Sequence, residues 1–182
     1  MDLDKLKEIL KEHKLWLETR GEEGKQADLS GADLRGVNFC GADLRGANLC
    51  EVNFDEADLS VADLRGADLS YADLSEVDLS GSNLSKANLR EANLRKVNLG
   101  RALLCEADFM NANLRKANLN GANLYKTNFH KANLCEADLN NANLSEVNLR
   151  GANLNGAKIS ESQKEEIKEK ILEWLGLEIT KI

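Results

Sequence analysis

Proline is absent from all 182 residues, and aromatic residues make up only 4% of the chain. Proline cannot donate a backbone hydrogen bond, so its absence indicates a fold that uses nearly every backbone N–H group. The shortage of rings is typical of a narrow interior. No run of 18 apolar residues occurs either, so the chain is not expected to contact a membrane.

The residues that carry most protein chemistry are also scarce. Only two histidines are present, His13 and His130, and no histidine–cysteine spacing fits a zinc site. Neither a P-loop nor a Gly-x-Ser-x-Gly motif occurs. The sequence therefore predicts no catalytic, metal-binding or cofactor-binding residues and no small-molecule substrate, so the protein is not expected to be an enzyme.

What the sequence has instead is a period of five. Leucine or phenylalanine occupies every fifth position from Leu29 to Leu154, and Ile159 takes the next one. Alanine or another small residue lies two positions before nearly every one of them, and Asp or Asn usually lies between. Because Asp and Asn exchange freely there, we expect this position to bond nearby backbone rather than to act in catalysis. A fixed short period marks a solenoid.

The period excludes continuous helices and strands. Five residues advance about 500° on an α-helix, so the leucines would share no face. Five is an odd number, so successive leucines of a continuous strand would point to opposite sides of the sheet. The chain must bend once per repeat, and turn pairs such as Arg35-Gly36 supply the corners. The period alone allows three or four sides per coil.

The repeat resembles that of the pentapeptide-repeat family. The family consensus, A-(D/N)-L-x-x, is matched by ADLRG at residues 42–46 and ANLRK at residues 92–96. The resemblance covers residues 27–160, with 27 consecutive repeats. It implies an all-β solenoid, a right-handed four-sided β-helix of just under seven coils, about 33 Å long at ~4.8 Å per coil.

Amphipathic segments flank the repeats and divide the chain into three parts. Residues 1–26 are expected to form an N-terminal capping helix and linker, with a helical apolar spacing at Leu6, Ile9, Leu10, His13, Trp16 and Leu17. Residues 161–182 are expected to form a C-terminal capping helix and tail. That helix has a capping box at Ser160 and Gln163, an apolar stripe and a stop at Ile167, Ile171, Leu172, Trp174, Leu175 and Gly176.

Covering both ends would prevent edge-to-edge growth of the β-helix, which predicts a monomer. In the alternative interpretation the C-terminal segment is a dimer surface, because some relatives pair end to end there.

The four cysteines are predicted to be free thiols. With the sides numbered 1 to 4 from Leu29, Cys50 lies on side 1, Cys135 on side 2, Cys40 on side 3 and Cys105 on side 4. No two share a column, so none reach the ~7 Å Cα separation that a disulfide needs. Free thiols suit the reducing cytoplasm, and the N-terminus lacks the apolar core of a secretory signal. A cytoplasmic location is therefore expected.

Charge is distributed unevenly along the repeats. Residues 27–80 hold 12 acidic and 3 basic residues, whereas residues 81–160 hold 6 acidic and 11 basic ones. The two halves thus carry net charges of −9 and +5. Such a polarity would steer a charged partner to one end of the rod or attract rods head to tail; drift between repeat duplications would also produce it.

These features favour a non-enzymatic scaffold that presents a rigid rod surface to an unidentified protein. The alternative is a DNA-mimicking regulator of a type II topoisomerase (DNA gyrase), an activity of some pentapeptide-repeat proteins. A rod of ~33 Å would need about 20 negative charges to match duplex DNA, but this solenoid carries −4. A third interpretation, nucleic-acid binding by the basic half, is disfavoured because aromatic residues do not alternate with the basic ones.

One candidate contact surface emerges from irregular outward positions. Leu103 lies at an outward position that Asn83 occupies one coil before and Asn123 occupies one coil after. Outward apolar groups that gather on a rod mark a contact site. The group expected to form this site is Leu103, Cys105, Tyr125, Met110 and His130.

Overall fold

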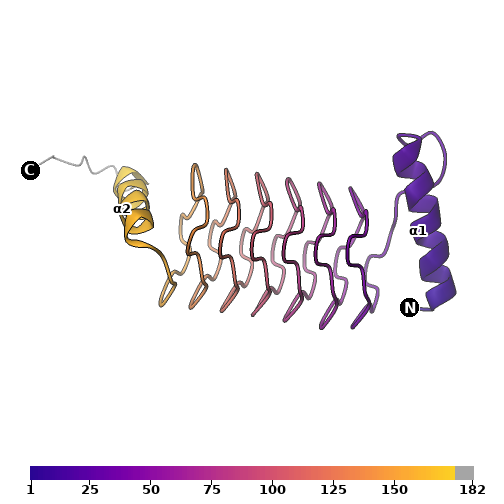
Figure 1. Cartoon of the computed structure of the whole chain (residues 1–182), viewed down its shortest axis with the longest axis horizontal. Coiled ribbons are helices and arrows are strands. Elements are labelled where there is room, and N and C mark those ends of the chain that lie inside the picture. Colours follow the sequence, from indigo (N-terminus) through magenta and orange to yellow (C-terminus); the bar gives the residue numbers. More distant parts are fainter. Residues whose placement is uncertain (175–182) are drawn as a thin grey trace, which may run out of the picture.

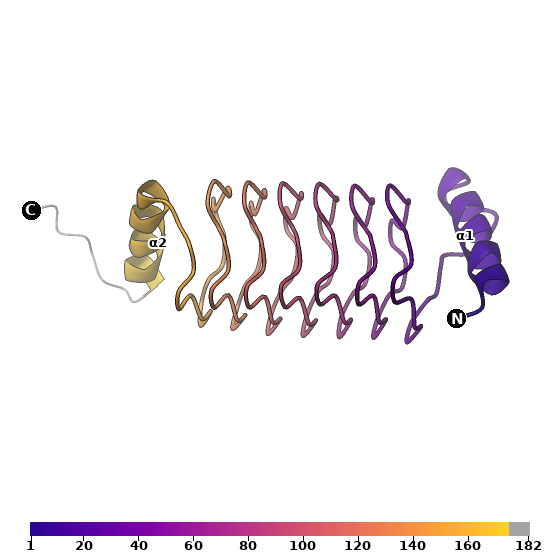
Figure 2. The same cartoon turned by 60° about the horizontal axis from the view of Figure 1, so that its bottom comes forward.

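A computed structural model describes residues 1–174. Within this range, helix α1 (Leu3–Glu18) and helix α2 (Glu161–Trp174) lie at opposite ends of a straight stack of coils (Figures 1 and 2). Parallel β-bridges join residues 20 positions apart, from Asp28–Asn48 to Asp138–Lys158. Each coil therefore contains four sides of five residues, which confirms the four-sided arrangement that the resemblance implies.

The sides are shorter than strands. Each side contributes one bridged residue, at the Asp/Asn position, and the described residues contain isolated bridges rather than continuous strands. The corners limit each side to a single bridge, because the chain turns again after three extended residues. The expected all-β solenoid is thus a coil held by single parallel bridges stacked in four columns.

In residues 92–96, a repeat in the middle of the stack, every N–H group donates a hydrogen bond. The N–H of Ala92 donates across the preceding corner (3.2 Å). The second, third and fifth N–H groups donate to carbonyls of the neighbouring coils at 2.8 to 3.0 Å. The N–H of Arg95 donates to the side-chain Oδ1 of Asn93 (3.4 Å). Proline at any of the five positions would remove a donor, which explains its absence.

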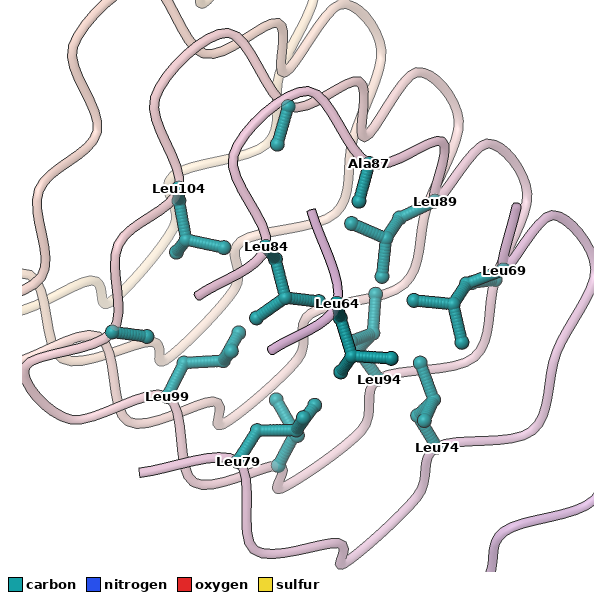
Figure 3. Close-up of a cluster of buried hydrophobic side chains, with 14 of the residues drawn as sticks. Leu64, Leu69, Leu74, Leu79, Leu84, Ala87, Leu89, Leu94, Leu99 and Leu104 are labelled. Carbon is teal, nitrogen blue, oxygen red and sulfur yellow. The ribbon is translucent and has the colours of Figure 1, made fainter. Parts of the chain in front are cut away.

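The core is a column of leucines. Leu64, Leu69, Leu74 and Leu79 point inward from the four sides of one coil, and the next coil repeats the arrangement (Figure 3). The phenylalanines contact one another in two pairs, Phe39 with Phe54 and Phe109 with Phe129. Aromatic rings thus fit the interior where they pack against a second ring.

The corners hold their second residue in the left-handed region of the backbone. From residue 31 to residue 156 this φ lies between +56° and +73° at every corner, and only nine of these residues are glycine. Val61, at φ +58°, is β-branched, and such residues rarely adopt this conformation. The hydrogen bonds between coils fix the corner in this conformation, so Val61 keeps a strained backbone conformation.

Helix α1 is bonded to the first coil. The Nδ1 atom of His13 accepts a hydrogen bond from the N–H of Ala27 (3.0 Å). The carbonyl of Glu12 accepts one from the N–H of Lys25 (3.1 Å). His13 is only 1% exposed, and its Nε2 atom has no hydrogen-bond partner. The histidine expected on the apolar face of the helix therefore joins the helix to the β-helix.

Helix α2 begins with the predicted capping box. The N–H of Ser160 donates to Oε1 of Gln163 (2.8 Å), and the N–H of Gln163 donates back to the serine hydroxyl (3.3 Å). Nε2 of Gln163 donates to the carbonyls of Leu139 and Ala142. In a continuing coil the Ala142 carbonyl would accept the backbone N–H of residue 163, so this side chain replaces the missing coil. The expected helix stop at Gly176, with Leu175, lies outside the described residues.

The first prediction concerns the inward register. Leu94→Ala should lower the free energy of unfolding by about 2–5 kcal/mol, because Leu94 is fully buried and its loss leaves a cavity. Arg95→Ser, one residue on and exposed, should cost under about 0.5 kcal/mol. Chemical denaturation of both variants measures the difference, and equal costs would contradict the register.

The second prediction concerns pH and His13. Burial lowers the pKa of His13, an effect that Arg45 reinforces and Asp43 opposes. The unfolded chain therefore binds the proton more readily, so His13 stabilises the fold above about pH 6.5 and this stabilisation is lost as the pH falls. The melting temperature should drop between pH 7.5 and 5.5, and by less in His13→Gln, which keeps an acceptor but does not titrate. Equal drops in the two proteins would show that His13 is not responsible.

Candidate functional site

The Asp/Asn position forms side-chain ladders along the rod. The amide Nδ2 of Asn93 donates to Oδ1 of Asp73, one coil before it (3.0 Å). Asn98 donates in the same way to Asp78 (3.0 Å). Each oxygen also accepts the N–H two residues on, as Asp73 does from Ser75 (3.0 Å). These side chains are occupied by structural bonds, in agreement with the role expected for this position.

The acidic half is partly neutralised by its own arginines. Arg45 and Arg65 bind Asp43 and Asp63 at 2.6 Å on side 4. Arg35 binds Asp33 through two nitrogens (2.8 and 2.9 Å). Hydrogen bonds from this guanidinium lower the pKa of Asp33 to about 2. The arginines of this half therefore lie against its aspartates.

Leu103 is exposed on side 4, as its place in the repeat predicts. Its side chain is 43% exposed, and its backbone bridges to Asn83 and Asn123 in the adjacent coils. Cys105, two residues on, is a half-buried free thiol. Leu103 therefore interrupts an amide column with an apolar group but leaves the backbone pairing intact.

Tyr125 lies one coil beyond Cys105 and is held in place. Its hydroxyl donates to Oε1 of Glu146 (3.0 Å). The ammonium of Lys126 lies 5.0 Å from the ring centroid and 3.5 Å from Glu146. Hydrogen bonding with Tyr125 and the charge of Glu146 raise the pKa of Lys126. The half-buried ring is thus oriented by Lys126 and by Glu146 of the following coil.

Met110 and His130 form a separate pair on side 1. Both are half-buried and share a column. In the chain between Cys105 and Met110, Glu106 and Asp108 face outward, and Asp108 pairs with Arg90 (3.0 Å). Leu103 and Cys105 therefore lie on side 4 and its corner in one coil, with Tyr125 at the same corner in the next coil, and we call these three residues the side 4 patch. Met110 and His130 lie at the next corner, and Asp108 with its partner Arg90 lies between them and side 4.

On the coils, two exposed apolar residues were not predicted from the sequence. Val61 is 66% exposed and Tyr71 57%, and both occupy the second position of a corner. Glycine or a polar or charged residue takes that position at the other described corners. An apolar residue at the second position of a corner is therefore the sequence signal that would have identified Val61 and Tyr71.

The surface offers little for a small ligand. A groove of about 930 Å³ lies along side 3, where Gly100 leaves room among Ser80, Lys116, Asn118 and Asp138. Within residues 1–174 no cluster of three or more His, Cys, Asp or Glu side chains could hold a metal ion. Nor is either described helix long and apolar enough to cross a bilayer.

The repeats match the family model of pentapeptide repeats, with eight copies over residues 27–66, 62–101, 92–130 and 127–162. The chain therefore belongs to the pentapeptide-repeat family. Comparison with curated protein sequences gives no match.

Solved structures of pentapeptide-repeat proteins are similar to this chain. One, from the thylakoid lumen of Arabidopsis thaliana, is 37% identical with a TM-score of 0.50 over 51% of this chain. The match covers 65% of that relative, just under two thirds of its length.

Two further structures are Rfr23 from the cyanobacterium Cyanothece 51142 and QnrB1. Rfr23 is 24% identical (TM-score 0.43), with 83% of this chain and 99% of that chain covered. QnrB1, a plasmid-mediated fluoroquinolone resistance protein, is 27% identical (TM-score 0.36), with 81% and 82% covered. At these TM-scores neither bears on function.

Proposed function

We propose that this protein is a non-enzymatic interaction scaffold in the cytoplasm, which binds a partner protein through the side 4 patch. The observation that carries the proposal is Leu103, an exposed leucine where amides precede and follow it in the column. Tyr125, the aromatic member of the patch, is of a residue type that is enriched among the residues contributing most binding energy at protein interfaces.

The rigidity of the coil supports this role. The preceding coil bonds the backbone of Leu103 through both its N–H and its carbonyl (2.9 and 2.7 Å). The bonds of Tyr125 with Glu146 and Lys126 orient the ring before any partner arrives. A preorganised surface loses little conformational entropy on binding, so a small apolar group can contribute most of the affinity.

The DNA-mimic alternative has one supporting observation, the net charge of −9 on residues 27–80. That value already counts Arg35, Arg45 and Arg65, each of which pairs with an aspartate. A supercoiling assay with DNA gyrase tests this alternative directly. Inhibition or protection that survives changes to the side 4 patch would favour it.

The third prediction tests the patch. Leu103→Asn combined with Tyr125→Ser should abolish capture of the partner, identified by mass spectrometry after affinity purification from host extract. Both positions face outward, so the free energy of unfolding should change by under about 1 kcal/mol.

The matched controls are Tyr71→Ser, which removes a more exposed ring, and Met110→Ser on side 1. Both should capture the partner as the wild type does. Capture that survives the double change, or that is lost with Met110→Ser alone, would contradict a contact centred on side 4.

A further inference from the structure

The corner between sides 2 and 3 carries an ordered series of charges. We call this line of side chains the 2–3 ridge, and number its coils 1 to 6 from Arg35. The ridge residues of coils 1 to 6 are Arg35; Asp55 and Glu56; Ser75 and Glu76; Arg95 and Lys96; Arg115 and Lys116; and Cys135 and Glu136. The charge signs are therefore positive, negative, negative, positive, positive and negative.

This series is complementary to itself when reversed. If a second copy lies antiparallel with the two-fold axis between coils 3 and 4, coil 1 faces coil 6, coil 2 faces coil 5 and coil 3 faces coil 4. Each of these three pairings then joins opposite charges, and the symmetry repeats each one. A two-fold contact of this kind is the commonest form of homo-oligomer, and both copies have the same coil spacing, so the register is maintained along the ridge.

We propose that two copies of this chain associate side by side and antiparallel through the 2–3 ridge. Asp55 and Glu56 of each copy contact Arg115 and Lys116 of the other. Glu76 contacts Arg95 and Lys96, and Arg35 contacts Glu136.

Within one chain some charges of this ridge are already paired and others are not. Arg35 binds Asp33 of its own chain (2.8 Å). Lys96 pairs with Glu76 (2.6 Å), and both Arg115 and Lys116 share Glu136 (2.6 and 3.3 Å). By contrast, no ion pair within the described residues involves Asp55, Glu56 or Arg95. In coil 5 two cations share one carboxylate, so that coil retains positive charge for the two acidic residues of a second copy.

The other corners lack this property. In the same reversed register, the corner between sides 4 and 1 joins opposite charges in two pairings (Arg45 with Glu146 and Lys86 with Glu106) but places Arg65 against Lys126, which repel. The corner between sides 3 and 4 carries a single charge in these coils, Arg101. The corner between sides 1 and 2 joins no opposite charges in this register. Self-complementarity therefore distinguishes the 2–3 ridge from the other corners of the rod.

An interface made by one ridge is small and charged, which places it among weak, salt-sensitive contacts. At 0.01 M salt the Debye length is about 30 Å, whereas at 1 M it is about 3 Å. We therefore expect dimers at low salt and high protein concentration, and monomers at high salt.

The experiment is a charge swap followed by sedimentation velocity at about 0.01 M and 1 M salt, with protein up to about 1 mM. The first variant is Asp55→Lys with Glu56→Lys, and the second is Arg115→Glu with Lys116→Glu. Each alone places like charges opposite each other in the dimer and should remain monomeric at low salt. An equal mixture restores opposite charges at both copies of this contact and should form a heterodimer.

The matched controls carry the same changes in net charge elsewhere. Glu51→Lys with Glu91→Lys raises the net charge by four at the corner between sides 1 and 2, and this variant should dimerise like the wild type. Lys86→Glu with Lys131→Glu lowers the net charge by four, and this variant should also dimerise. Circular dichroism confirms that every variant is folded.

Zero-length crosslinking provides the second measurement. Glu56 and Lys116 are three coils apart in one chain, or about 14 Å, so a direct amide between them must join two chains. Mixing isotope-labelled and unlabelled protein should show this crosslink between the copies at low salt only.

Three results would overturn the proposal: a wild type that stays monomeric at low salt, variants that each dimerise alone, or a mixture that stays monomeric. If the variants dimerise alone as the wild type does, the contact lies elsewhere on the rod. Because the side 4 patch lies diagonally across the coil from the 2–3 ridge, loss of partner capture and loss of dimerisation are separable.

Discussion

The hydrogen bonds between adjacent coils are the interaction on which the rest of this structure depends. The N–H groups of a repeat are all engaged, as in residues 92–96, so the chain has no proline. The same bonds hold corner residues such as Val61 in a backbone conformation that their side chains disfavour. Each corner is hydrogen-bonded to the coils on both sides, and these bonds override the backbone preference of the residue that occupies it. The outward side chains can therefore vary widely.

The ends of the solenoid show how side chains substitute for missing coils. His13 accepts a backbone N–H of the first repeat, and Gln163 donates to carbonyls near the last one. In both places a side chain from a helix satisfies a backbone group that an open end would leave bare. The two helices therefore terminate the hydrogen-bond network as well as covering the apolar interior.

The period of five in the sequence was sufficient to predict which residues point inward, where the chain turns and where α2 begins, because these depend on neighbours within a few residues. It did not show that each side is a single bridged residue, which depends on how tightly the corner closes. It placed His13 only on an apolar face, since its bond to Ala27 depends on tertiary structure. For the candidate site, it could not show that Asp108 and Arg90 separate Met110 from Leu103. Which outward side chains meet depends on ion pairs between coils.

The bridge spacing of 20 residues has a consequence for how this surface evolves. Insertion of a whole coil lengthens the rod but returns every later residue to its original side. Insertion of one repeat instead rotates all later residues by a quarter turn relative to earlier ones, while the leucine core is preserved. Patches on opposite halves of the rod can therefore be realigned in a single genetic step, without a change to any residue that contacts a partner.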